Sequence, residues 1–250
     1  MVDRQVLQRR LLLRLYGLGT NTGLKRVLTG EEGTTDKELR YVRERFIRKD
    51  GLCEAIAKVI NATFAAKQTT IWGESSTTCA SDSKKFGAWD QKLMTKWHIR
   101  YGGRGVMIYW YVENKSVCIY PQLKRCSSSE VAMIEGLLRH NTDMDVQRNY
   151  TDNHGQTAVG FAFCYLLGFD LMPRLKAIAL QKLYLPAVGT SGDYSNLDPI
   201  VIAPINWEFI RQQYDEMVKF AIAMRLGTAL TEAILRRFNQ YNRQHPTYRA

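Results

Sequence analysis

The sequence predicts an α/β protein in which a mixed β-sheet, flanked by helices, lies between two helical regions. Two patterns predict this class. Apolar residues recur at helical spacing in the first third of the chain and again near its end. Between these parts, β-branched and aromatic runs without a helical period alternate with helical segments. We therefore divide the chain into a helical region (1–67), a sheet-containing core (68–176) and a second helical region (177–250).

The first region contains a clear helix start signal. Thr35 precedes Glu38 by three residues, which is the spacing of a capping box. Asp50 is placed to cap the following helix. The apolar stripes that we expect to be buried are Leu39, Val42 and Phe46 in the first of these helices and Leu52, Ile56, Val59 and Ile60 in the second.

The opposite side of the first of these helices is basic. It carries Arg40 and Arg43, and Lys49 follows at its end. Basic side chains on a helix can contact DNA phosphates, but a charged helix face is usually just solvated. The pattern alone leaves both interpretations open.

The core opens with segments that favour strands. Residues 69–71 and 77–82 are short and β-prone, and residues 106–112 (VMIYWYV) and 116–120 (SVCIY) are more strongly so. Only three residues link the last two segments, which predicts a β-hairpin.

Helices and strands then alternate through the rest of the core. Residues 127–130 (SSSE) form a second capping box at the start of a helix, and residues 145–152 favour a strand. Residues 156–167 are apolar nearly all round and end at Gly168, as a buried helix would, and residues 171–175 favour a last strand. The order of strand, hairpin, helix, strand, helix and strand is that of the ribonuclease-H-like fold.

The last region returns to helical patterns after an irregular stretch marked by proline and glycine. Asn206 is placed to cap a long helix that runs through Leu226, and Gly227 breaks it. A short basic helix is expected to follow and to end near Phe238.

Composition narrows the class of function. The 250 residues carry a net charge of +11 and a pI near 9.5, which favours a polyanionic partner, most commonly nucleic acid, over a merely soluble basic protein. The five cysteines are odd in number and widely spaced, which argues against a disulfide framework or a structural zinc site. No stretch resembles a signal peptide or a membrane span, so we expect a cytoplasmic protein without a membrane partner.

Two acids are candidates for metal chemistry. Asp82 ends the expected strand 77–82, and Asp152 ends the expected strand 145–152. In the strand order above these strands are parallel neighbours, so both carboxylates should emerge at the same edge of the sheet. Phosphoryl transfer on DNA commonly uses divalent cations held by carboxylates, and Mg²⁺ needs few of them because it keeps several waters. An aspartate that merely bonds nearby backbone N–H groups at a strand end is the alternative.

Basic residues surround this pair in sequence. Nine lysines and arginines but only two acids lie between Ser83 and Arg125, and aromatic residues are interleaved with them. His154, two residues after Asp152, is a further candidate for a phosphate contact. The aromatic residues of the 106–112 strand are better explained as core. Candidates for DNA contact are therefore Lys84, Lys85, Arg100, Arg104, Lys124, Arg125 and His154.

Several long stretches resemble the transposases of the bacterial Tn-three family. They are TTCASDSKKFGAWD (77–90), WHIRYGGRGVMIYW (97–110), KSVCIYPQLKRCSSSEV (115–131), HGQTAVGFAFCYLLGFDLMPRLK (154–176) and INWEFIRQQYDEMVKFAIAMRLGTA (205–229). The resemblance covers essentially the whole chain. It implies a ribonuclease-H-like catalytic domain with an Asp-Asp-Glu triad, and a helical insertion over 177–250.

The resemblance also implies an activity and partners. Members of the family nick transposon ends with Mg²⁺ (or Mn²⁺) and join the freed 3′-hydroxyl to target DNA. Asp82 in ASDSKKF matches the first acid and Asp152 in YTDNHGQ matches the second. The third acid lies farther downstream in the family, past the end of this chain. We therefore assign it to none of the glutamates in the region that resembles the insertion, which are Glu208, Glu216 and Glu232.

Two smaller departures from the family pattern are tyrosines. Tyr111 stands where YWHVE has a histidine, and Tyr165 stands where FCHLLG has one. The expected protein is a catalytically incomplete transposase region, which acts with DNA and with a second copy or a full-length transposase. The alternative is a non-catalytic DNA-binding or interfering protein. A tyrosine recombinase ranks lower, because no Arg/His cluster surrounds a tyrosine.

Overall fold

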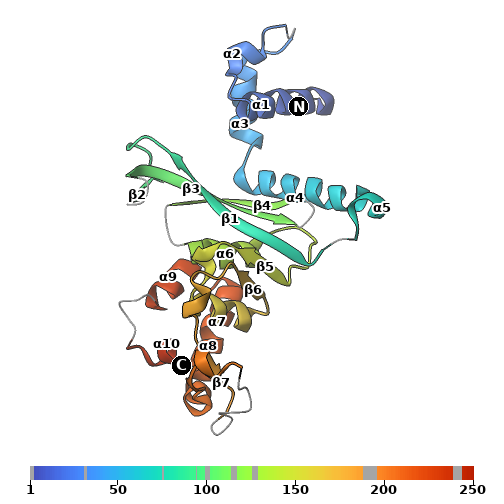
Figure 1. Cartoon of the computed structure of the whole chain (residues 1–250). Helices are drawn as coiled ribbons and strands as arrows, with labels where there is room; N and C mark the ends of the chain where they lie inside the picture. Colours follow the sequence, from blue (N-terminus) through green and yellow to red (C-terminus); the bar gives the residue numbers. More distant parts are fainter. Residues whose placement is uncertain are drawn as a thin grey trace. The chain divides into compact units, whose positions relative to one another are not determined.

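The computed structural model describes residues 3–30, 33–74, 76–93, 95–98, 102–113, 117–125, 129–187, 196–238 and 244–250. The chain divides into two compact units, residues 1–62 and residues 63–250. Figure 1 shows the helices of the first unit in blue to cyan and the sheet of the second in green to yellow. No helix in the described ranges combines the length and the apolar character needed to cross a membrane.

The first unit is helical, as predicted. Thr35 and Glu38 form the predicted capping box, and Leu39 and Val42 are buried, but Phe46 is 42% exposed. Helix α1 also packs closely on α2. The closeness shows at Gly17, where an added Cβ would lie 3.0 Å from Val27 Cγ2. The helices are α1 (Arg4–Gly19), α2 (Leu24–Val27), α3 (Asp36–Phe46) and α4 (Lys49–Ala66), of which α4 continues into the second unit.

The apolar stripe predicted for α4 is wrong except for Ile60. Leu52, Ile56 and Val59 are exposed, whereas Ala57 and Ile60 are buried. The buried face is therefore turned by about one residue from the predicted one, since neighbouring helical positions differ by about 100°. Asp50 is the second residue of α4 and not its cap, because the helix already begins at Lys49.

The second unit is built on a mixed sheet. In the described part of the chain this sheet has six strands in the order β2-β3-β1-β5-β6, with β4 paired to β3. Strand β3 is antiparallel to β1, β2 and β4, whereas β5 is parallel to both β1 and β6. The strands are β1 (Thr78–Gly87), β2 (Lys96–His98), β3 (Gly103–Glu113), β4 (Cys118–Arg125), β5 (Arg148–Thr151) and β6 (Asp170–Pro173). This arrangement confirms the predicted ribonuclease-H-like class.

Two strand predictions need correction. Residues 69–71 belong to helix α5 (Thr69–Trp72), because the N–H groups of Ile71 and Trp72 donate to the Gln68 carbonyl in one helical turn, and no described strand pairs with this segment. Strand β1 does not end at Asp82 but continues to Gly87, because β3 pairs with it along that whole length. Asp82 therefore lies within a strand. The predicted hairpin of β3 and β4 is confirmed, and its tip at residues 114–116 lies outside the described residues.

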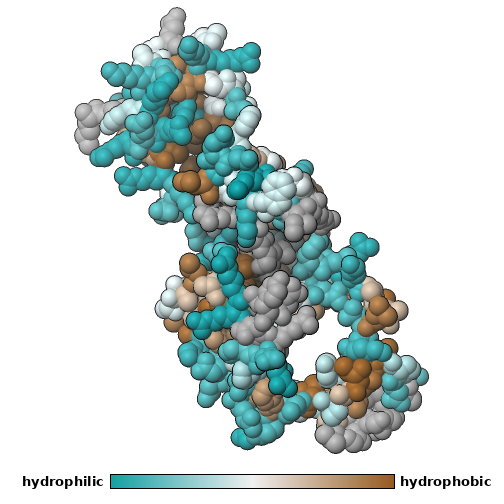
Figure 2. Space-filling model, turned by 90° about the vertical axis from the view of Figure 1, so that its left-hand side faces the viewer, coloured by the Kyte–Doolittle hydropathy of each residue, from teal (hydrophilic) through white to brown (hydrophobic). Residues whose placement is uncertain are grey.

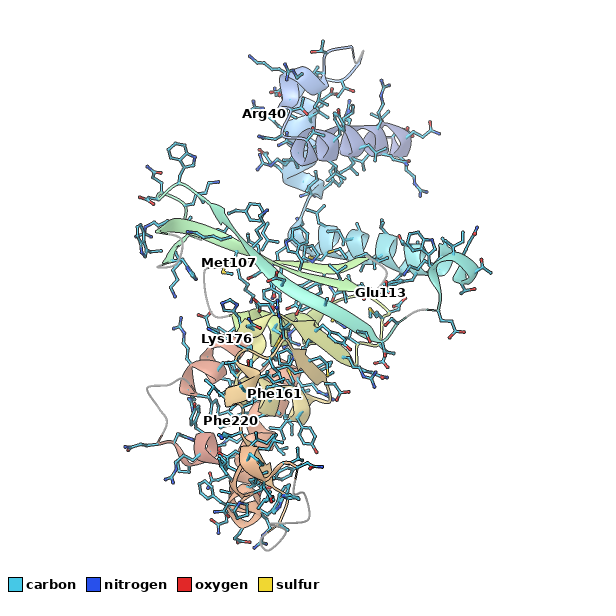
Figure 3. All side chains as sticks on the ribbon, viewed as in Figure 1. Arg40, Met107, Glu113, Phe161, Lys176 and Phe220 are labelled. Carbon is cyan, nitrogen blue, oxygen red and sulfur yellow. The ribbon has the colours of Figure 1, made fainter. Side chains whose placement is uncertain are left out.

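Helices α6 (Ser129–Arg139) and α7 (Ala158–Leu167) pack on one face of the sheet (Figure 1). The predicted helix after 127–130 is thus confirmed, although the proposed capping residues lie outside the described side chains. Helix α7 ends at Gly168, which has a φ of 83°, as predicted. The expectation that α7 is buried nearly all round is wrong. Phe161 (labelled in Figure 3) is 40% exposed and Tyr165 is 83% exposed, because only one side of α7 is buried.

The region after β6 packs back onto these two helices. Arg225 of α8 donates a hydrogen bond to the Leu167 carbonyl, and Arg139 of α6 donates one to the Met224 carbonyl at 2.9 Å. The predicted caps of α8 are confirmed, since Asn206 accepts a bond from a backbone N–H and Gly227 adopts a φ of 70°. The elements are η3 (Ile178–Leu180), β7 (Leu183–Leu185), η4 (Asp198–Ile200), β8 (Val201–Pro204), α8 (Trp207–Leu226), α9 (Thr231–Leu235), η5 (Arg236–Phe238) and α10 (Pro246–Arg249).

Candidate active site

The two candidate acids stand on neighbouring parallel strands. In the register of β1 with β5, Ser81 pairs with Thr151, and this is the last pair of the ladder. Asp82 directly follows Ser81, and Asp152 directly follows Thr151. The prediction that the two strands are adjacent and parallel is therefore confirmed.

Alternation along β1 gives the face on which Asp82 lies. Cys79 and Ser81 are buried, whereas Ala80, Asp82 and Lys84 are exposed. Successive side chains of a strand point to opposite faces, so Asp82 lies on the face opposite to the one that α6 and α7 cover. The antiparallel partner of Asp82 on β3 is a tryptophan, Trp110, which is 38% exposed on the same face.

Each aspartate is oriented by local hydrogen bonds. Asp82 Oδ1 accepts a bond from the Ser83 backbone N–H at 2.6 Å. Asp152 caps the short helix η2 (Asn153–Gly155), and its Oδ1 accepts from the His154 backbone N–H at 3.0 Å. His154 Nδ1 donates to Asp152 Oδ2 at 2.6 Å, and both side chains are about half exposed. Because an ionised carboxylate has about four acceptor sites, these bonds leave both acids able to bind a cation.

A buried tyrosine lies within electrostatic reach of both acids. The Tyr109 hydroxyl is 3.5 Å from Ser81 Oγ, on the covered face of the sheet. Burial raises the pKa of Tyr109, and the negative charges of Asp82 and Asp152 raise it further. Both carboxylates therefore disfavour ionisation of the same hydroxyl group.

The donor chemistry of this pair suits a hard divalent cation. Mg²⁺ prefers oxygen ligands, keeps several waters, and is usually held by one or two carboxylates. Within the described ranges, no group of three or more His, Cys, Asp or Glu residues is arranged to hold a metal ion. Asp82 and Asp152 therefore fit as part of a ligand set and not as the whole of one.

The candidate DNA contacts differ in their surroundings. Lys84 is exposed on the same face as Asp82, two residues along β1. Lys85 donates to the Gly103 carbonyl at 2.6 Å, and Lys124 forms an ion pair with Glu135 of α6. Arg104 Nε lies 3.6 Å from Asp90 Oδ1.

Two other candidates are less fully described. Arg125 is the last residue of β4, and Arg100 lies outside the described residues. Tyr109 and Tyr111 of the 106–112 strand are buried, which agrees with their interpretation as core. The core interpretation is wrong for Trp110, which is 38% exposed, because alternation along that strand places it opposite to its two tyrosine neighbours.

Comparison with known proteins now defines the class. Residues 2–250 match the family model described as the Tn3 transposase DDE domain. The chain therefore belongs to this family. It is 27% identical over 237 residues to the transposase of transposon Tn1546 from Enterococcus faecium, and 28% identical over 240 residues to the transposase of transposon Tn501 from Pseudomonas aeruginosa.

The matched part is a fraction of these relatives. Each alignment covers 94% of this chain, and the chain spans 24% of the length of either transposase. Among solved structures, the Mos1 mariner paired-end complex with Mn matches with a TM-score of 0.29 and 12% identity, covering 84% of this chain and 75% of that one. A TM-score this low supports no argument about the site.

Proposed function

We propose that Asp82 and Asp152 are two metal-binding carboxylates of a DNA strand-cleavage and strand-transfer reaction. The observation that carries the proposal is the register of β1 with β5, in which the two acids directly follow the last paired residues of parallel neighbours. Membership of the Tn3 transposase DDE domain family supports it. The reaction proposed is nicking of transposon ends, followed by attack of the 3′-hydroxyl on target DNA.

The residues of this chain would position the metal and the DNA. Mg²⁺ or Mn²⁺, when bound, supplies activation of the attacking oxygen and stabilisation of the leaving oxygen. Asp82 and Asp152 would hold the cation through carboxylate oxygens whose orientation the Ser83 and His154 bonds restrict. The family pattern implies a glutamate as the third ligand, and we assign it to no residue of this chain.

DNA is the proposed partner, as transposon end and as target. The net charge of +11 favours a polyanion. Lys84 is the candidate contact closest along the chain to Asp82 on the exposed face. Arg104, on β3, is also exposed, although it lies 3.6 Å from Asp90, and Lys85 and Lys124 are engaged in contacts within the protein.

Metal binding is the direct test. Mn²⁺ is titrated into the purified chain and into the Asp82→Asn/Asp152→Asn double variant by isothermal calorimetry. We expect the chain to bind Mn²⁺ and the double variant to lose this binding, because both acids serve one site. Asp215→Asn, an exposed acid on α8, removes the same charge elsewhere and should bind Mn²⁺ like the unaltered chain.

The outcomes separate the two functional classes. Equal Mn²⁺ affinity in the chain and the double variant would contradict the proposed site. Absence of Mn²⁺ binding together with salt-sensitive binding of duplex DNA would support the alternative, a non-catalytic DNA-binding protein. Circular dichroism of each variant tests whether the fold is retained.

A further inference from the structure

One arginine of the first unit is buried and has no partner among the residues that the structure describes. Arg14 of α1 is only 7% exposed, and its Nε is covered and makes no hydrogen bond. No hydrogen bond or ion pair of Arg14 occurs within the part of the chain that the structure describes. Burial of an unpaired charge is costly, and native proteins rarely leave such a group without an ionic partner.

Its neighbour one turn earlier shows the contrast. Arg10 lies on the same side of α1 and forms an ion pair with Glu38 of α3. Glu38 also closes the capping box with Thr35, so both of its carboxylate oxygens already accept hydrogen bonds. The α1–α3 packing therefore pairs Arg10 with an acid, whereas Arg14 forms no ion pair with a residue that the structure describes.

Two arginines of α3 act electrostatically on Arg14. Burial is the largest effect that lowers the pKa of Arg14, and the positive charges of Arg43 and Arg40 lower it further. Asp36 acts in the opposite direction, but its carboxylate accepts a hydrogen bond from Arg40 Nε at 2.7 Å. Arg40 (labelled in Figure 3) and Arg43 are three residues apart, so they share one side of α3. Arg14 is thus acted on by the charges of two further arginines and of one partly neutralised carboxylate.

We propose that Arg14, Arg40 and Arg43 form a phosphate-binding site, and that the phosphate belongs to the backbone of DNA. A phosphate presents several acceptor oxygens, which would accept hydrogen bonds from guanidinium groups and offset the repulsion among the three arginines. Residues 1–62 contain thirteen lysines and arginines against eight acids, which suits a polyanion as the occupant. Figure 2 shows mostly hydrophilic residues on this unit, at the top, with hydrophobic residues among them.

This site is separate from the proposed metal site. It uses no residue of the β1–β5 ladder, and it requires no cation. The choice of DNA as the occupant rests on the proposed function, whereas the phosphate site itself does not. Two measurements therefore address the two parts of the proposal.

The first measurement tests the site with inorganic phosphate. Thermal unfolding of the whole chain is followed with and without phosphate at constant ionic strength. We expect phosphate to raise the melting temperature, and we expect Arg14→Met and Arg43→Gln to lose this rise. Arg45→Gln changes the same charge on another side of α3 and should keep it. A rise that survives in Arg14→Met would overturn the site. The site would also be overturned if Arg45→Gln lost the rise in melting temperature equally, or if phosphate did not raise the melting temperature of the unaltered chain.

The second measurement tests DNA as the occupant. Binding of a fluorescent duplex by the whole chain is measured against salt concentration. Loss of one phosphate contact should weaken binding about fivefold to tenfold near 0.1 M salt and reduce the salt slope by about one. We expect this in Arg14→Met and Arg43→Gln but not in Arg45→Gln. Unchanged DNA affinity beside a lost phosphate effect would overturn the DNA assignment. DNA binding kept while Mn²⁺ binding fails would count only against the metal site.

Discussion

His154 holds both oxygens of the Asp152 carboxylate. Its backbone N–H donates to Oδ1 at 3.0 Å, and its ring Nδ1 donates to Oδ2 at 2.6 Å. The backbone bond follows from the capping position of Asp152 and would survive most substitutions at 154. The ring bond depends on the side chain, so it is the part of this arrangement that mutation can remove. Groups that orient a metal-binding carboxylate in this way commonly affect metal affinity.

His154→Ala should therefore weaken the Mn²⁺ affinity proposed for the Asp82–Asp152 pair, by about tenfold. The reason is that Asp152 loses the bond that restricts its rotation. His154→Asn, whose side-chain amide can also donate, should recover part of the loss. Calorimetric titration with Mn²⁺ measures both variants. Equal affinity in His154→Ala and the unaltered chain would show that the ring bond does not position the carboxylate.

Close packing of α6 on β3 predicts a large effect of a small substitution. A Cβ added at Gly136 would lie 1.9 Å from Cζ of the Tyr111 ring, and the Tyr111 hydroxyl donates to the carbonyls of Ala132 and Met133. Gly136→Ala should therefore lower the free energy of unfolding by about 1–3 kcal/mol. Urea denaturation measures the change.

The matched control is Gly51 of α4. A Cβ at Gly51 meets nothing within 4 Å, so Gly51→Ala should leave stability unchanged or raise it by up to about 1 kcal/mol. A Gly136→Ala variant as stable as Gly51→Ala would contradict the packing described. Tyr111→Leu replaces the ring that lies against Gly136 with a smaller side chain. The double variant Tyr111→Leu/Gly136→Ala should therefore lose less free energy of unfolding than the sum of the losses in the two single variants.

Local chemistry explains which parts of the fold the sequence predicts. The capping box at Thr35, the Asn206 cap and the Gly227 end of α8 are each set by residues within one helical turn, and all three are confirmed. The parallel pairing of β1 with β5 was also predicted, because the order of elements restricts the possible sheets.

The wrong predictions concern contacts between distant segments. The buried face of α4 runs through Ala57 and Ile60, and composition alone does not distinguish it from the neighbouring face with Leu52 and Ile56. Strand β1 passes Asp82 because β3 continues to pair with it. The ion pair of Lys124 with Glu135 likewise depends on how α6 packs on β4. These features depend on the tertiary structure, so local sequence patterns do not predict them.

His140 predicts a dependence of stability on pH. Burial lowers its pKa from the ordinary value of 6.5, although the charge of Asp145 opposes this effect. The unfolded chain then binds a proton more readily than the folded chain, so protonation favours unfolding. Stability should be fully present above about pH 6.5 and should fall as the pH drops toward the lower, folded-state pKa of His140.

Urea denaturation between pH 7.5 and 5 measures this effect, and His140→Gln should flatten the curve over that interval. The Gln side chain can still bond to Thr142, whose Oγ1 lies 3.0 Å from His140 Nδ1. An equally steep loss of stability in His140→Gln would assign the pH dependence to other groups.

Lys84 and Lys85 form a natural test of the proposed DNA face, because they are adjacent in β1 and point to opposite sides of the sheet. Lys84 is exposed beside Asp82, whereas Lys85 Nζ donates to the Gly103 carbonyl at 2.6 Å. Lys84→Gln should weaken binding of duplex DNA and reduce its salt slope by about one. Lys85→Gln removes the same charge but should mainly lower thermal stability. Fluorescence anisotropy at several salt concentrations measures both variants. A smaller slope in Lys85→Gln than in Lys84→Gln would place DNA on the covered face and contradict the proposed one.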